Sequence, residues 1–312
     1  MEFPYRGDAK AVKRRIESRT SRTAEWICMS RALSFLEENG CFKSDDYIAP
    51  SLLPTFLRIL FRISYFRRLF VRKMPAKGIY EYVIARTKYI DAVFKEALAR
   101  GFGQIVLFGA GFDTRALRFS NQAGDAKVFE LDAPATQEAK IGQYHRRGFD
   151  VPASLVFVPI DFEREPIRVG LEKAGFDKEK RSLFILEGVL MYLQPESVHE
   201  TFRAMQGLAA AGSEIVFDYV YASVLRGEGG CYGEKGMVET VSKAGEGWRF
   251  GIEKGGANSF LAEYRMYVAD EKDSAGLEEA YFKDCAASKK KTADNRLGRV
   301  NGTHCLVRAV VG

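Results

Sequence analysis

Acidic residues follow three hydrophobic stretches of the sequence, each at the point where the stretch ends. Glu130 and Asp132 end VFELD, Asp161 ends FVPID, and Glu187 ends LFILE. Carboxylates accept hydrogen bonds from hydroxyls and amines. Each one alone could be a helix cap or half of a loop ion pair. Their recurrence at three strand ends indicates a site for a ligand with hydroxyls, an amine and positive charge, and disfavours a pyrophosphate.

A glycine turn precedes these carboxylates in QIVLFGAGFDTRALRF, residues 104–119. Gly109 and Gly111 have no Cβ, so the backbone can turn sharply and approach a ligand. Asp113 is predicted to cap the helix that follows. A strand, a glycine turn and a helix N-terminus form a ligand site at the carboxyl edge of a sheet. We therefore expect Gly109, Ala110 and Gly111 to contact a nucleotide-like cofactor.

The residues around this turn distinguish two cofactors. A dinucleotide site needs a third glycine beside the pyrophosphate, and GAGFDT has aspartate and threonine instead. Asp132 lies about 20 residues after the turn, where a carboxylate accepts from both ribose hydroxyls. Asp161 can accept from an adenine amino group while Phe162 covers the ring. The pattern favours S-adenosylmethionine, which has no phosphate, over NAD.

The sequence resembles the leucine carboxyl methyltransferase-like family of S-adenosylmethionine-dependent O-methyltransferases. The resemblance rests on four motifs in order, RTKYID (86–91), GAGFDTR (109–115), ELDAP (130–134) and EGVLMYL (187–193). It extends more loosely to residues 22–32 and to the C-terminal RVNGTHCLVRAVV. It therefore covers most of the chain.

The resemblance implies roles for individual residues. Arg86 would grip the methionine carboxylate of the cofactor, and its planar guanidinium matches a carboxylate in a way that a lysine does not. By position, the remaining cofactor contacts would come from Gly109, Asp132, Asp161, Phe162 and Glu187. Tyr192 would lie near the methyl acceptor. Arg22 and Arg31 both compete for a further basic contact, and that role stays open.

The methyl acceptor is predicted from the bases that the sequence lacks. A carboxylate with a pKa near 4 is already ionised at neutral pH, whereas a phenol near 10 needs a positioned base. Because no histidine ends a predicted strand, we expect a carboxylate acceptor on a small molecule or a protein C-terminus. An acidic hydroxyl is second, with Tyr192 or Tyr219 handling its proton. An NAD-dependent oxidoreductase and a non-catalytic cofactor-binding regulatory protein are the other hypotheses.

Strands and helices alternate regularly after residue 100, which predicts a doubly wound α/β sheet. Strands are expected at 104–109, 126–131, 154–160, 182–187, 213–219, 266–270 and 303–311, and helices at 78–100, 113–121, 134–147, 165–174, 195–209, 258–265 and 274–282. The resemblance implies a seven-stranded class I methyltransferase sheet whose last strand is antiparallel. We expect the cofactor-binding domain at 78–312, with a glycine-rich insertion at 220–256 as a mobile cover over the acceptor.

The N-terminal region, residues 1–77, is predicted to be a helical extension. A helix over 8–39 would end at Gly40. A second helix over 56–74 is amphipathic with a basic face, because Phe56, Leu60, Ile63 and Phe70 fall at helical spacing while the arginines at 58, 62 and 72 lie largely elsewhere. Residues 1–75 hold 15 Lys and Arg against 8 Asp and Glu. The second helix could be a lid or packing helix, a groove for an anionic substrate, or a membrane-surface helix. The sequence favours the lid.

Composition sets the remaining expectations. The chain has 312 residues, a net charge of +6 and five cysteines without a Cys-x-x-Cys pair. We expect reduced thiols, a cytoplasmic protein and no metal site. No stretch approaches the roughly 20 apolar residues of a membrane span. Neither a nucleic-acid partner nor a membrane partner is predicted, and the oligomeric state stays open.

Overall fold

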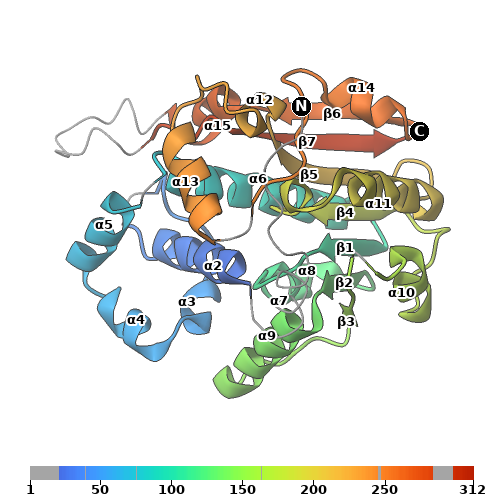
Figure 1. Ribbon diagram of the computed structural model, residues 1–312. Helices are drawn as coiled ribbons and strands as arrows, with labels where there is room; N and C mark the ends of the chain where they lie inside the picture. The colour runs from blue at the N-terminus through green and yellow to red at the C-terminus, as the bar shows by residue number, and fades with distance from the viewer. Residues whose placement is uncertain (1–20, 39, 75, 163, 245–246, 284–297) are drawn as a thin grey trace.

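The seven strands form one sheet in the order β3-β2-β1-β4-β5-β7-β6 (Figure 1). This is a computed structural model, which describes residues 21–38, 40–74, 76–162, 164–244, 247–283 and 298–312. The strands are β1 (Gln104–Phe108), β2 (Lys127–Asp132), β3 (Leu155–Pro159), β4 (Ser182–Leu186), β5 (Glu214–Val220), β6 (Met266–Lys272) and β7 (His304–Val311). Strands β1 to β5 pair in parallel, and β7 runs antiparallel between β5 and β6. The predicted fold class and the antiparallel last strand are confirmed.

Helices connect these strands and cover both faces of the sheet. In the described residues they are α2 (Arg22–Phe35), α3 (Ala49–Leu52), α4 (Thr55–Leu60), α5 (Ser64–Arg72), α6 (Ile79–Ala99), α7 (Arg115–Arg118), α8 (Ser120–Ala123), α9 (Pro134–Arg147), α10 (Ile167–Lys173), η1 (Leu190–Tyr192), α11 (Pro195–Leu208), α12 (Ala222–Leu225), α13 (Glu234–Ala244), α14 (Ala257–Ala262) and α15 (Ser274–Tyr281). Helices α6, α9, α10, α11, α14 and α15 lie within a few residues of their predicted bounds, and the predicted helix over 113–121 is divided into α7 and α8.

Successive residues of each strand face two different cores, because side chains alternate along a strand. Ile105 and Leu107 of β1 pack with α2, α6, α9 and α15. Val106 and Phe108 pack with α10, α11 and α14 on the other face. Alternate residues of a strand therefore contact different sets of helices.

The predicted helix over 8–39 is shorter in the structure. Helix α2 ends at Phe35, and Leu36 rather than Gly40 is its C-cap. The hydroxyl of Ser34 donates to the Phe42 carbonyl at 2.6 Å, which holds the returning chain against the helix end. Residues 8–20 of the predicted helix lie outside the described residues.

The predicted helix over 56–74 is two helices, α4 and α5, with a break at 61–63. Arg67 lies inside the corner, and its Nη1 donates to the carbonyls of Phe61 at 2.9 Å and Arg62 at 3.1 Å. These carbonyls follow α4, so the guanidinium satisfies backbone acceptors that a continuous helix would have paired with amides. The Arg67 side chain therefore stabilises the break between the two helices.

The insertion at 220–256 contains more regular structure than its glycines suggested. It includes α12 and α13, and Tyr221 forms a parallel bridge with Ile252. Gly233 has a φ of +79°, and a Cβ there would lie 2.2 Å from the Lys77 carbonyl oxygen. Part of the segment is therefore packed closely on the N-terminal side of α6.

The structure bears on two expectations from composition, those about membrane spans and about cysteines. No helix in the described ranges is long and apolar enough to cross a membrane. Cys28, Cys231 and Cys305 are free.

Candidate active site

The parallel strands bring their carboxyl ends to one edge of the sheet. Gly109 follows β1, Asp132 ends β2, and Glu187 follows β4. Asp218, near the end of β5, lies at the same edge and hydrogen-bonds to Gly188, the residue after Glu187. The edge thus gathers carboxylates from three strands around the glycine turn.

A network of four arginines and five carboxylates lies buried beside this edge. Its closest pairs are Arg86 with Asp218 at 2.6 Å, Arg115 with Glu187 and with Asp91 at 2.7 Å each, Arg118 with Asp91 at 2.7 Å, and Arg31 with Asp46 at 3.0 Å; Arg115 also pairs closely with Asp113. We call these nine residues the arginine–carboxylate network. Such charges tolerate burial only when each has an opposite partner.

Glu187 is held between two of these arginines. Its Oε1 accepts from Arg86 Nε at 3.1 Å and its Oε2 from Arg115 Nη1 at 2.7 Å. Its side chain keeps 11% of its surface exposed, whereas that of Arg115 keeps none. Arg115 Nη2 is buried and has no hydrogen-bond partner among the described residues. Arg115 therefore keeps an unused hydrogen-bond donor next to Glu187, the most accessible carboxylate of the network.

Asp218 fixes Arg86 from the opposite side. Its Oδ2 accepts from Arg86 Nη1 at 2.6 Å and from the Tyr82 hydroxyl at 2.7 Å, and its Oδ1 accepts from the Gly188 amide at 2.5 Å. Burial would raise the pKa of Asp218, but Arg86, His304 and these donors together hold it below its usual value. Asp218 is thus an anion that orients the arginine.

His304 lies beside this group, and its tautomer follows from its hydrogen bonds. Asn301 accepts from the Thr303 amide at 3.1 Å while its Nδ2 donates to Lys77, so its Oδ1 is an acceptor. The Thr303 hydroxyl donates to that Oδ1, and its oxygen lies 2.8 Å from His304 Nδ1. The proton of His304 is therefore on Nδ1 and the lone pair on Nε2.

The surroundings of His304 keep it neutral. The ring stacks on Tyr82 at 4.5 Å and meets the Trp248 ring edge-on at 5.3 Å. Burial, assisted by Arg86 and opposed by Asp218, lowers the pKa of His304 to about 4. A base this weak holds a proton poorly at neutral pH.

The glycine turn takes the predicted conformation. Gly109 and Gly111 have φ values of +58° and +50°, a region that favours glycine. A Cβ on Gly109 would lie 2.8 Å from Val189 Cγ2. The Asp132 carboxylate accepts from the Gly111 amide and, at 2.6 Å, from the Ala133 amide. Asp132 and the turn, including Ala110, therefore form one hydrogen-bonded unit.

The helix after the turn begins later than predicted. Thr114, not Asp113, is the N-cap of α7. Asp113 still accepts from the Arg115 amide at 2.7 Å, and its second oxygen pairs with the Arg115 guanidinium. Its carboxylate therefore belongs to the network as well as to the turn.

The other predicted cofactor residues belong to β2 and to the segment after β3. Glu130 lies on the same face of β2 as Asp132, is fully buried and accepts from Lys140 Nζ at 2.7 Å. Asp161 follows β3, which is parallel to β2, so it lies at the same carboxyl edge, 3.6 Å from Arg164. Phe162 packs near Phe108, the last residue of β1, with ring centroids 6.2 Å apart.

Of the two tyrosine candidates, only Tyr192 remains near the edge, in the short helix η1 that follows Glu187. Tyr219 is wrong for this role. It follows Asp218 on β5, so its side chain points to the opposite face of the sheet, where its hydroxyl donates to Glu271 at 3.1 Å.

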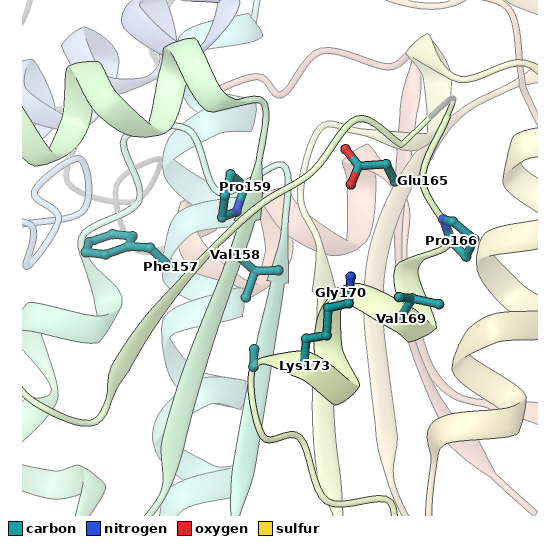
Figure 2. Close-up of a pocket in the computed structure, with 9 residues that line it drawn as sticks. Phe157, Val158, Pro159, Glu165, Pro166, Val169, Gly170 and Lys173 are labelled. Carbon is teal, nitrogen blue, oxygen red and sulfur yellow. The ribbon is translucent and has the colours of Figure 1, made fainter.

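One cavity in the described part of the chain lies beside the edge strand β3. It has a volume of about 520 Å³ and lies between β3 and α10, lined by Val158, Pro159, Glu165, Gly170 and Lys173 among others (Figure 2). None of the predicted cofactor residues lines it. The candidate site therefore rests on the strand ends and the network, and not on this cavity.

Comparison with known proteins identifies the class. A methyltransferase of Thermobifida fusca superposes with a TM-score of 0.55 at 16% identity, covering 91% of this chain and 95% of that one. A DUF574 family protein of Streptomyces avermitilis gives 0.56 at 10% identity, covering 96% and 100%. The fold is that of the class I S-adenosylmethionine-dependent methyltransferases.

Sequence similarity identifies the family within that class. Residues 31–206, more than half of the chain, match the family described as leucine carboxyl methyltransferase. The chain belongs to that family, as predicted. A protein of Mycolicibacterium smegmatis named as an S-adenosyl-L-methionine-dependent methyltransferase is 27% identical over 264 residues, 81% of this chain and 84% of that one. One of the same name in Mycobacterium marinum is 30% identical over 213 residues, 66% and 68% of the two chains.

The network fits the cofactor of this class by charge. Its four arginines and five carboxylates, all ionised, sum to −1. S-adenosylmethionine carries a sulfonium, an ammonium and one carboxylate, which sum to +1. Glu187, the most accessible of the five carboxylates, suits the cationic groups. A pyrophosphate would add negative charge beside a network whose net charge is already −1, which disfavours the NAD hypothesis.

Proposed function

We propose that this chain is an S-adenosylmethionine-dependent O-methyltransferase whose acceptor is a carboxylate, so that the product is a methyl ester. An acidic hydroxyl is the second candidate acceptor. The carboxylate belongs either to a small molecule or to the C-terminus of a protein, and the chemistry of transfer is the same for both.

One observation supports a carboxylate over a hydroxyl: the groups near the edge that could remove a proton are engaged or weak. Glu187 is paired with two guanidiniums, and Asp218 accepts from three donors. His304 has a pKa lowered to about 4, chiefly by burial, which is far from the value near 10 of a phenol. An acceptor that is already ionised needs none of them.

The chain's own residues would position the reactants. The cofactor, when bound, supplies an electrophilic methyl group on sulfur. Arg86, held by Glu187 and Asp218, would orient the methionine carboxylate of the cofactor through its planar guanidinium. Asp132 would accept hydrogen bonds from the ribose hydroxyls of the cofactor. Holding nucleophile and methyl in line can lower a barrier by about 7 to 11 kcal/mol, so no acid or base is required.

The test is the product formed from cell extract with methyl-labelled cofactor. The proposal predicts a labelled ester that mild alkali hydrolyses with release of methanol, at a rate that varies little between pH 6 and 8. A product stable to alkali, formed at a rate that rises about tenfold per pH unit, would point to a hydroxyl acceptor instead. In that case Tyr192→Phe should lower the rate.

A further inference from the structure

Exposed apolar side chains gather on one corner of the N-terminal region. Eight large apolar side chains are exposed in the described part of the chain, and five lie within residues 47–65. Phe56, Ile59, Ile63 and Tyr65 are 67%, 62%, 54% and 65% exposed. We call residues 54–73 the α4–α5 corner. Figure 1 shows α4 and α5 at the periphery of the molecule, away from the sheet.

The same corner is uniformly basic. Residues 47–80 contain seven Lys and Arg and no Asp or Glu. Arg62, Arg68 and Lys73 are exposed, close in sequence to the exposed apolar residues. Residues 68 and 65 lie three apart on α5 and so share one side of that helix. Positive charge and apolar surface are therefore presented together.

The corner has a fixed shape. Arg67 is turned inward to the carbonyls of Phe61 and Arg62, and the rings of Phe61 and Phe70 meet edge-on at 5.5 Å. Leu57, Leu60 and Phe70 pack against the main core from this segment. The inner side of the corner is therefore packed against the core. The apolar side chains on its outer side remain exposed even though the corner is folded.

We propose that the α4–α5 corner binds the surface of a lipid bilayer that contains anionic lipid. Phe56, Ile59 and Ile63 would enter the boundary between headgroups and acyl chains, while the basic side chains meet lipid phosphates. A second copy of this chain fits less well, because residues 54–73 contain no acid and a symmetric contact between two such corners would set basic residues against basic residues. This proposal does not depend on the proposed reaction.

The first experiment is co-sedimentation of the full chain with vesicles of phosphatidylcholine alone or with phosphatidylglycerol. We expect binding to the anionic vesicles only, weakened by salt. The variant R62Q/R68Q/K73Q should lose about a hundredfold in affinity, since each basic side chain near an anionic surface contributes roughly tenfold or less. The variant F56S/I59S/I63S should lose about tenfold or more.

A matched control removes three exposed charges elsewhere, K173Q/K178Q/K180Q, and should bind as the parent does. Phe56→Trp should show a blue-shifted emission and quenching by brominated lipid when anionic vesicles are added. The proposal is overturned if the chain ignores anionic vesicles, if both corner variants bind like the parent, or if the control loses as much. Binding that resists every corner variant would assign the contact to another segment.

Discussion

Asp218 is the carboxylate on which the position of Arg86 depends. It is fully buried and accepts from Arg86, from the Tyr82 hydroxyl and from the Gly188 amide. Gly188 directly follows Glu187, so one side chain couples the arginine to the end of β4. Removing the charge of Asp218 would leave Arg86 with Glu187 alone.

Asp218→Asn should therefore lower the free energy of unfolding by about 3 to 5 kcal/mol, the usual cost of breaking a buried ion pair from one side. Urea denaturation followed by circular dichroism measures it. Glu172→Gln removes an exposed partner of Arg168 and should leave the midpoint unchanged. An unchanged midpoint in Asp218→Asn would show that the buried pair does not orient Arg86 as described.

The neutral state of His304 makes a prediction about pH. Its folded pKa of about 4 lies below the ordinary value of 6.5, so between these values the unfolded chain binds a proton that the folded chain does not. Stability contributed by this group is complete above pH 6.5 and is lost as the pH falls toward 4. The loss should be about 3 kcal/mol.

The comparison is the slope of unfolding free energy against pH in the parent and in His304→Gln. The variant should show a shallower fall between pH 6.5 and 4. Parallel slopes for parent and His304→Gln would mean that His304 is protonated in the folded protein.

At the scale of elements, the α4–α5 corner depends on one inward-turned cation. Arg67→Met keeps much of the side-chain volume but leaves the carbonyls of Phe61 and Arg62 without their donor. The loss should be about 1 to 3 kcal/mol. Hydrogen exchange should accelerate across residues 55–72 and stay unchanged in β1 to β5. Arg68→Met, on the exposed side, is the control, and equal protection in both variants would contradict the account.

The sequence predicted those parts of the site that follow directly from strand ends. Gly109, Asp132 and Glu187 each close a hydrophobic run, and parallel strands bring such ends together. Asp218 was missed because β5 continues to Val220, so its acid stands inside the run. Tyr219 is next to Asp218 on the same strand, so its side chain faces the opposite side of the sheet. His304 was missed because only the antiparallel pairing of β7 returns its first residue to this edge.

The elements show the same division between local and tertiary causes. The bounds of α9 follow from Pro134 at its start and Gly148 at its end, where φ is +66°. The split between α4 and α5 involves the inward position of the Arg67 side chain. The spacing of apolar residues in the sequence does not predict that position. Charge pairing is similarly tertiary: the sequence shows Arg115 next to Asp113, but not its contacts with Asp91 and Glu187.

At the scale of the whole molecule, a buried acidic network and an exposed basic corner lie in different parts of the fold. The carboxyl edge of the sheet gathers a network with a net charge of −1, which suits a cationic cofactor. The α4–α5 corner is basic and apolar, and residues 1–75 carry an excess of seven positive charges while the rest of the chain is nearly neutral. The net charge of +6 therefore describes the N-terminal region and not the cofactor site.

The central claim is that the glycine turn and the arginine–carboxylate network bind S-adenosylmethionine, and titration calorimetry tests it most directly. The parent should bind S-adenosylmethionine with micromolar affinity and give no heat with NADH. Arg86→Ala and Asp132→Ala should each weaken binding by about 1 to 3 kcal/mol, because each leaves a charged or polar partner unpaired, while Arg168→Ala on the exposed side of α10 should not. Binding of NADH in place of S-adenosylmethionine, or unchanged affinity in both site variants, would contradict the account.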